Sequence, residues 1–389
     1  MNLSRRNFLR VGGIGLGAAA TSALPMPIAA FAQRCGEPPR TPKTAGGLSY
    51  PILLNGNENP YGPLPKVKAA MPETLALANR YPDFKYEKLV ATVAKTHKVK
   101  PEQVHVSCGS TEILKMAADE FAANGARLVV PHPTFEAIAH YTEAEHGRVV
   151  QVPLRPDYSH DLPNMLKAMG SGPGLFYICN PNNPTASLTA RAEIEDFIKK
   201  IPPNTYVLVD EAYHHFAVGA PGYQSFLDHP VDDERVFVAR TFSKVYGMAG
   251  LRLGYAVGAV PTIKRLDTEE LYDDVNCVAA HCGALALEDT AEMLQAVERI
   301  NGDRAAFLAE CDKRGIKYVP SYANFVLLHV GSLSREVRAT MHAQGILVGR
   351  PFALLNPWLR ISLGLPEEMR AFWTAWDGMK DCLGDVTKS

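Results

Sequence analysis

Two cations stand out in the segment VARTFSKVYGMAGLRLGYAVG, residues 238–258. Lys244 follows Thr241 and Ser243 at the end of an apolar run, and Arg252 lies between two leucines at the start of the next run. A lysine in a desolvated pocket has a lowered pKa and can react with a carbonyl group. A guanidinium among apolar residues indicates a buried anion, most simply a phosphate. Taken alone, Lys244 is as well explained by an ordinary solvated lysine.

A second candidate for anion binding is VSCGSTEIL, where Gly109, Ser110 and Thr111 join an apolar run to a helical pattern. Backbone N–H groups at such a glycine turn point toward an anion, so a phosphate fits there. The same residues also suit an ordinary helix N-cap. The motif alone leaves both interpretations open.

Two further apolar runs also end in polar side chains. Asn183 belongs to YICNPNNPTASL, whose asparagines and prolines also suit a rigid turn. Asp210 ends the run in VLVDEAYHHF, and Tyr213 follows three residues later. A carboxylate at the end of a buried strand needs a partner, which is either a structural arginine or the cationic ring nitrogen of a cofactor.

The apolar runs that carry these residues alternate with helical patterns between about residues 104 and 260. This alternation predicts an α/β fold with a mostly parallel sheet covered on both faces. Ligands in such folds bind at the carboxyl ends of the strands, which is where the polar residues lie. We predict a large domain over residues 76–289. A smaller α+β domain is predicted from residues 290–389 and part of an N-terminal arm, residues 33–75.

The polar groups at the strand ends form a chemically coherent set. They comprise a phosphate cradle, a carboxylate, a phenol, an amide, an amine and a guanidinium. Pyridoxal 5'-phosphate requires such a set: donors for its phosphate, an acid for the ring nitrogen, donors to the ring oxygen and a lysine for the aldehyde.

The same motifs, in the same order, make the chain similar to the class I/II (fold type I) pyridoxal-phosphate aminotransferases, most closely the histidinol-phosphate aminotransferase branch. The resemblance runs from LNGNENPYGP to LRISLG and covers nearly the whole chain after its N-terminal segment. It implies that Lys244 in TFSK binds the cofactor aldehyde and serves as general acid and base. Asp210 in DEAY would pair with the pyridine nitrogen, and Tyr213 would donate to the ring oxygen.

The resemblance implies the remaining cofactor contacts as well. Asn183 would share the ring oxygen, and Phe135 in HPTF would stack on the ring. Tyr81 in NRYPD resembles a tyrosine that reaches the phosphate from the partner subunit, which implies a homodimer with shared active sites. The phosphate itself would be held by Gly109, Ser110, Thr111, Thr241, Ser243 and Arg252.

Three residues match substrate positions of the family. Arg360 in LRISLG matches the arginine that binds the substrate α-carboxylate, while Tyr61 and Arg350 match other substrate-side positions. One segment departs from the family, which usually has a proline and an aromatic residue before VN. Here it reads EELYDDVNC, with Asp273 and Asp274. Two carboxylates near the substrate would disfavour a phosphate, so we expect unphosphorylated amino donors.

The first 32 residues predict export. Arg5 and Arg6 precede a short apolar segment rich in glycine and alanine, and Ala30 and Ala32 form an A-x-A cleavage site. The twin arginines indicate the Tat route. Because that route carries folded cargo, we predict cofactor loading in the cytoplasm, cleavage near Ala32 and a periplasmic protein. A membrane anchor is the alternative, and the short, glycine-diluted segment argues against it.

Composition narrows the remaining possibilities. The 389 residues are 47% apolar and 21% charged, which suits a soluble chain of one large or two ordinary domains. A formal net charge of -1 gives no indication of nucleic-acid binding. The seven cysteines have neither a C-x-x-C nor a metal-ligand spacing, so we predict no metal site. Whether any of them form disulfides stays open.

We therefore predict an aminotransferase that moves an amino group from an amino acid, or from a histidinol-phosphate-like amine, to a 2-oxo acid in two half reactions. A decarboxylase, a racemase or an amino-acid cyclase could use the same lysine on the same fold. A secreted binding protein without catalysis is a third possibility, and the full set of cofactor residues argues against it.

Overall fold

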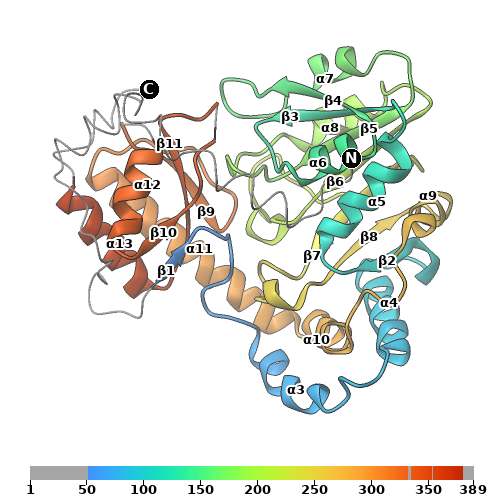
Figure 1. Ribbon diagram of the computed structural model, residues 1–389, viewed down its shortest axis with the longest axis horizontal. Coiled ribbons are helices and arrows are strands. Elements are labelled where there is room, and N and C mark those ends of the chain that lie inside the picture. The colour runs from blue at the N-terminus through green and yellow to red at the C-terminus, as the bar shows by residue number, and fades with distance from the viewer. Residues whose placement is uncertain (1–50, 332–333, 353, 380–389) are drawn as a thin grey trace, which may run out of the picture.

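The computed structural model describes residues 51–331, 334–352 and 354–379. The predicted signal peptide and the start of the predicted N-terminal arm lie outside these residues. Figure 1 shows a large domain around a broad sheet and a smaller domain beside it, with the long helix α11 (Thr290–Lys313) between them.

The large domain is built on a seven-stranded sheet in the order β2-β8-β7-β6-β5-β3-β4. Neighbouring strands from β7 to β4 pair in parallel, while β8 runs antiparallel to both β7 and β2. The mostly parallel α/β sheet predicted from the apolar runs is therefore confirmed. The strands are β2 (Val104–Ser107), β3 (Arg127–His132), β4 (Arg148–Pro153), β5 (Gly174–Cys179), β6 (Thr205–Asp210), β7 (Val236–Thr241) and β8 (Gly254–Gly258).

Helices cover both faces of this sheet, as the continuous apolar strands require. In β5, Leu175 and Tyr177 belong to one buried cluster, and Phe176 and Ile178 to the other. The first cluster includes residues of α5 (Ser110–Ala122), α6 (Ala137–Ala144) and α9 (Val260–Leu266). The second includes residues of α3 (Pro65–Leu75), α4 (Asp83–His97), α7 (Leu162–Met169), α8 (Arg191–Ile198) and α10 (Cys277–Glu288).

The small domain takes strands from both ends of the described chain. β1 (Ile52–Leu54) pairs in parallel with β10 (Ile346–Val348), although they lie far apart in the sequence. The remaining elements are β9 (Phe325–His329), which pairs antiparallel with β11 (Trp358–Ser362), and the helices α12 (Ser334–Ala343) and α13 (Pro366–Gly378). Across the described ranges, no helix combines the length and apolarity needed to cross a membrane.

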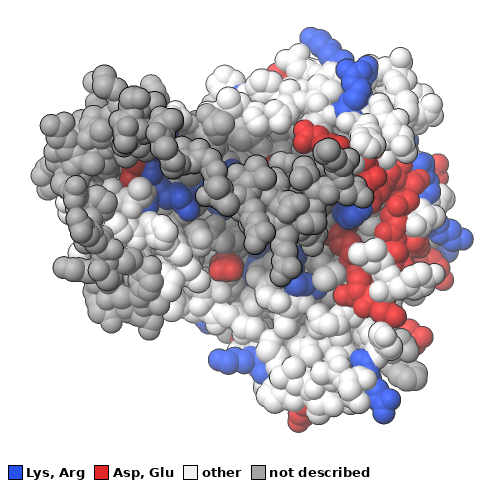
Figure 2. Space-filling model, in the orientation of Figure 1, with Lys and Arg blue, Asp and Glu red and all other residues white. Residues whose placement is uncertain are grey.

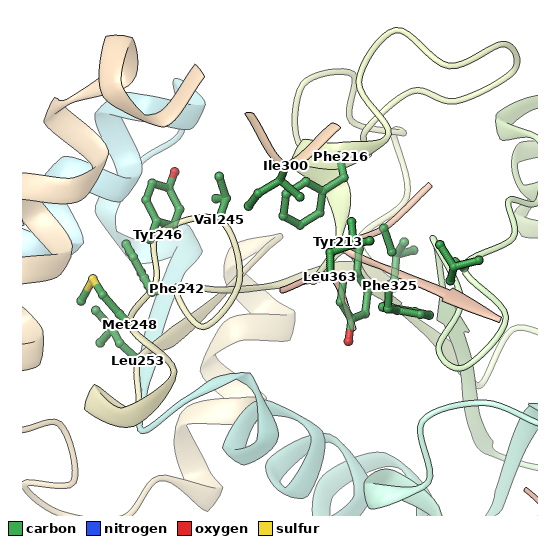
Figure 3. Close-up of a cluster of buried hydrophobic side chains, with 14 of the residues drawn as sticks. Tyr213, Phe216, Phe242, Val245, Tyr246, Met248, Leu253, Ile300, Phe325 and Leu363 are labelled. Carbon is green, nitrogen blue, oxygen red and sulfur yellow. The ribbon is translucent and has the colours of Figure 1, made fainter. Parts of the chain in front are cut away.

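A buried apolar cluster connects the two domains beneath the strand ends (Figure 3). The ring of Tyr213, just after β6, meets the ring of Phe325 in β9 edge to face, with centroids 5.1 Å apart. On the other side of the view, Phe242 and Val245 flank Lys244 in the sequence and are buried in the same cluster. The loop that carries Lys244 is thereby anchored on both sides by apolar packing.

The charged surface of the large domain is mixed rather than basic. On the face in view, Figure 2 shows acidic side chains gathered over α5, with basic side chains scattered around them. In this region Glu120 of α5 pairs with Arg265 of α9.

Candidate active site

The polar residues singled out in the sequence converge on one cavity of about 200 Å³. They reach it from loops after β2, β3, β5, β6 and β7 and from β11 in the small domain. The lining includes Ser110, Thr111, Phe135, Asn183, Asp210, Tyr213, Thr241, Ser243, Lys244, Arg252 and Arg360. Four lining residues were not singled out beforehand: Gly56, Asn57, Cys179 and Ala212.

Lys244 is not a solvated surface lysine. Its Nζ lies 5.6 Å from the centroid of the Tyr213 ring, inside the cavity. Burial, and then the nearby Arg360 charge, lower the pKa of this amine to about 8, although Glu58 and Asp210 oppose the shift. A lysine with such a pKa supplies far more neutral amine near pH 7 than an exposed one does, and neutral amine is the nucleophilic form.

The glycine turn before α5 faces Arg252. Gly109 is the N-cap residue of α5, has φ +80° and has no side chain with which to cap the helix. A Cβ on Gly109 would lie 2.3 Å from Arg252 Nη2, so only glycine allows this approach. On the far side, a Cβ on Gly254 would lie 2.2 Å from the backbone nitrogen of Ser110. The turn therefore places a helix N-terminus against a guanidinium. This arrangement favours a phosphate-binding site over an ordinary helix N-cap.

Hydroxyl groups complete this cradle. Arg252 Nη1 donates to the carbonyl of Ala249 at 3.0 Å, which directs the guanidinium, and lies 3.5 Å from Ser243 Oγ. The backbone N–H of Ser243 donates to Thr241 Oγ1 at 3.1 Å. Both hydroxyl side chains line the cavity beside the guanidinium.

Asp210 ends β6 with its carboxylate buried. Its Oδ2 accepts from the Tyr177 hydroxyl at 2.7 Å, and its Oδ1 accepts from the backbone N–H of Ala212 at 3.0 Å. Burial raises the pKa of Asp210 in spite of these donors. The buried arginine near this strand end, Arg240, pairs instead with Glu211 at 2.7 Å. A cationic ring nitrogen is therefore the better explanation for Asp210 than a structural arginine.

Tyr213 and Asn183 face the cavity from neighbouring strand ends. Asn57 Nδ2 donates to the Tyr213 hydroxyl oxygen at 3.0 Å, which leaves the hydroxyl proton of Tyr213 free to donate elsewhere. Burial raises the pKa of Tyr213, so this proton stays in place at neutral pH. The loop of Asn183 is braced by Asn182, which accepts from Thr134 Oγ1 at 2.7 Å. A braced turn and a cavity-lining side chain thus coexist in this motif, on adjacent asparagines.

Arg360 presents its guanidinium to the same cavity from β11. Its Nη1 donates to Asn183 Oδ1 at 2.6 Å, and its Nη2 donates to the carbonyl of Asn55 at 2.8 Å. The buried Nε has no hydrogen-bond partner among the described residues. Burial is the main cause that lowers the pKa of Arg360. A planar carboxylate is the natural ligand for a guanidinium held in this way.

Besides Gly109, three predicted site residues lie outside the cavity lining of the single chain. The Tyr61 hydroxyl donates to Asp303 Oδ2 in α11 at 2.9 Å; burial, and then this bond, raise its pKa to about 12. Arg350 pairs with Glu136. Tyr81 is 75% exposed, and its contact with a partner subunit stays a prediction.

The expectation that Asp273 and Asp274 lie near the substrate is wrong for the single chain. Asp274 Oδ2 accepts from the backbone N–H of Cys108 at 3.1 Å, and Asp274 also hydrogen-bonds Glu112. Burial, and then this carboxyl pair, raise the pKa of Glu112 to about 8. Both aspartates line a separate cavity with Tyr86. The segment before α10 thus contacts the start of α5, and neither aspartate lines the cavity of Lys244.

The donor set fits pyridoxal phosphate. Gly109 and Gly254 leave a cradle that a Cβ would fill, next to a helix N-terminus and the guanidinium of Arg252. A lysine with a lowered pKa and a buried aspartate, Asp210, lie in the same cavity.

Comparison with known proteins decides the family. The family described as aminotransferase class I and II matches residues 50–374. The chain belongs to this family.

The aminotransferase is 35% identical over 354 residues to the histidinol-phosphate aminotransferase of Symbiobacterium thermophilum, covering 90% of this chain and 95% of the relative. It is also 34% identical over 331 residues to the aromatic amino acid aminotransferase of Cutibacterium acnes, covering 82% and 89%. Its fold matches histidinol-phosphate aminotransferase from Sinorhizobium meliloti in complex with pyridoxal-5'-phosphate, with a TM-score of 0.79, 24% identity and coverage of 94% and 98%. The enzyme is a pyridoxal-phosphate-dependent aminotransferase, and relatives at similar identity are named for different donors.

The geometry indicates what this chain's residues would do in the reaction. The cofactor supplies an electron sink when it is bound. Asp210 would keep a proton on the ring nitrogen, and Tyr213 would donate to the ring oxygen. Arg360 would orient the donor through its carboxylate, so that Lys244 Nζ can take the proton from the donor Cα.

Proposed function

We propose that this aminotransferase acts in the periplasm and transfers the amino group of an unphosphorylated α-amino acid to a 2-oxo acid. The observation that carries the substrate class is Arg360 in the cavity of Lys244. Its fork is braced by Asn183 and by the carbonyl of Asn55, and its Nε has no partner among the described residues. A carboxylate matches this planar group in both shape and charge.

The relatives support transamination and leave the donor open. Histidinol-phosphate and aromatic amino acid aminotransferases are both similar to the chain over more than four fifths of its length. In histidinol phosphate, a CH2–O–phosphate group takes the place of the carboxylate that histidine carries on Cα. A side-by-side assay of these two donors therefore tests the anion that Arg360 accepts. We expect histidine or an aromatic amino acid to give the higher kcat/KM, and a clear preference for histidinol phosphate would overturn the substrate proposal.

Periplasmic action rests on the twin arginines and the A-x-A site in residues 1–32. Replacing Arg5 and Arg6 by lysine should leave active, uncleaved enzyme in the cytoplasm. The control is the unaltered chain in the same cells, whose activity should move to the periplasm with a new N-terminus near residue 33. Equal export of the lysine variant would contradict the proposed route.

A further inference from the structure

An ion pair joins the two domains near the rim of the active-site cavity. Glu136 directly follows Phe135, which lines the cavity, and directly precedes α6. Arg350 follows β10 in the small domain. Arg350 Nη2 donates to Glu136 Oε2, and the two side chains are 49% and 47% exposed.

This pair lies beside the anion-binding arginine. The guanidinium carbons of Arg350 and Arg360 lie 4.4 Å and 5.8 Å from the centroid of the same ring, that of Phe352. The charges of Arg350 and Glu136 both reach Arg360: the first adds to the lowering of its pKa by burial, and the second opposes it. Two guanidinium groups thus flank one aromatic ring, and a carboxylate neutralises only one of them.

We propose that Glu136 is a specificity-determining residue that occupies Arg350, leaves Arg360 as the single cation for the donor's anion, and so selects a carboxylate over a phosphate ester. This inference rests on the proposed function, because it explains why the donor is unphosphorylated. It assigns the selection to a residue of the β3–α6 loop that touches neither the cofactor cradle nor Lys244.

The charges of the two anions explain the selection. A carboxylate carries one negative charge and is matched by one guanidinium. A phosphate monoester carries about -1.5 to -2 charges at neutral pH. Moving a dianion into a partly desolvated cavity with one matching cation leaves charge uncompensated, which is costly. Arg350 would supply the second cation, but its Nη2 already donates to Glu136 and its Nη1 to the carbonyl of Pro351.

The test replaces Glu136 by glutamine, which keeps the size of the side chain and removes its charge. Binding to the holoenzyme is measured by calorimetry with 3-phenylpropanoate and 3-phenylpropyl phosphate, which lack an amine and cannot react. We expect the variant to bind the phosphate ester about tenfold more tightly, while its affinity for the carboxylate changes much less. The kcat/KM ratio of histidinol phosphate to histidine should shift in the same direction. An unchanged ratio of the two affinities would overturn the proposal.

Two controls distinguish the effect of the Glu136–Arg350 ion pair from the effect of losing any nearby negative charge. Glu143 lies on α6, and its carboxylate is 4.0 Å from His140. Glu143→Gln removes the same charge from the helix that Glu136 precedes and should leave the affinity ratio unchanged; an equal gain there would overturn the proposal. In the double variant Glu136→Gln/Arg350→Gln, the gain should disappear, and a persistent gain would show that Arg350 is not the freed cation.

The binding assay also distinguishes this inference from the proposed function. If the wild-type enzyme preferred histidinol phosphate, the proposed donor class would fail, whatever the variants did. If the wild-type enzyme preferred amino acids and Glu136→Gln left the affinity ratio unchanged, only the role of Glu136 would fail.

Discussion

The Tyr177 hydroxyl donates to Asp210 Oδ2 at 2.7 Å across two neighbouring strands, β5 and β6. This bond and the bond from the Ala212 N–H to Oδ1 fix the plane of the carboxylate. Both bonds also favour the ionised form and so oppose the rise in the pKa of Asp210 that burial causes. Tyr177 thus positions Asp210, the acid that we predict to serve the cofactor ring.

Asp210→Asn should keep the shape of the site and remove its charge. Cofactor should still bind, because the phosphate cradle is untouched. Turnover should fall about 100-fold or more, since the ring nitrogen loses the group that keeps it protonated. Single-turnover rates with a good donor measure this effect. Tyr177→Phe is the milder companion, with an expected loss of about tenfold. Near-normal turnover of Asp210→Asn would contradict its assignment.

The lowered pKa of Lys244 predicts a pH profile. Only the neutral amine attacks an aldehyde, so cofactor capture by the apoenzyme should rise with pH and level off above about 8. A lysine of ordinary pKa would give a rate still rising at pH 9. Stopped-flow absorbance after mixing apoenzyme with cofactor gives the profile.

Lys244→Ala is the control for this profile. It should abolish the pH-dependent phase, and borohydride should no longer fix cofactor to the chain. Fixation at another lysine would show that Lys244 is not the attachment point.

Gly254→Ala tests the cradle. The added Cβ would lie 2.2 Å from the backbone nitrogen of Ser110 and would displace the N-terminus of α5. Overpacking of this kind costs about 1–3 kcal/mol, so cofactor affinity should fall about tenfold or more. The matched control is Gly250→Ala nearby, where an added Cβ has no atom within 4 Å. Equal retention of cofactor by both variants in equilibrium dialysis would contradict the cradle.

Tyr81 provides the test of a shared site. It is 75% exposed in the single chain, and the family resemblance assigns it to the partner's phosphate. Tyr81→Phe should weaken cofactor retention. Mixing an inactive Tyr81→Ala variant with an inactive Lys244→Ala variant should restore activity, because one site of each hybrid dimer then has both native residues. Absence of activity, with subunit exchange shown by mass spectrometry, would count against a shared site.

The sequence predicted the part of the site that depends on strand order. Lys244, Asp210 and Asn183 each follow an apolar run, and parallel strands bring such ends to one edge. Residues whose role depends on tertiary contacts were missed. Tyr177 looks like any apolar strand residue in the sequence. The alternating pattern of a strand predicts the face of the sheet on which a residue lies, but not the residue that it contacts. Glu136 reads as an ordinary residue before a helix, since its partner lies 214 residues away.

The Asp273 and Asp274 expectation failed for a related reason. The resemblance located the segment before α10, but not the direction of its side chains. The backbone N–H of Cys108 and the carboxyl group of Glu112 hold Asp274 against the start of α5, and nothing local in EELYDDVNC predicts either contact. Asn57 carried a usable signal, because an asparagine next to glycine tolerates its left-handed φ of 53°. Its bond to Tyr213 had no such signal.

Asn57 also limits when the site can form. Its backbone N–H donates to Ser362 Oγ, 305 residues later, and its side chain donates to Tyr213. Contacts between such distant residues carry a large loop-closure entropy and form slowly. A nascent chain therefore cannot form the contact between Asn57 and Ser362 until β11 has left the ribosome. The segment around Asn57 must therefore wait for most of the chain to be made before it can form these contacts.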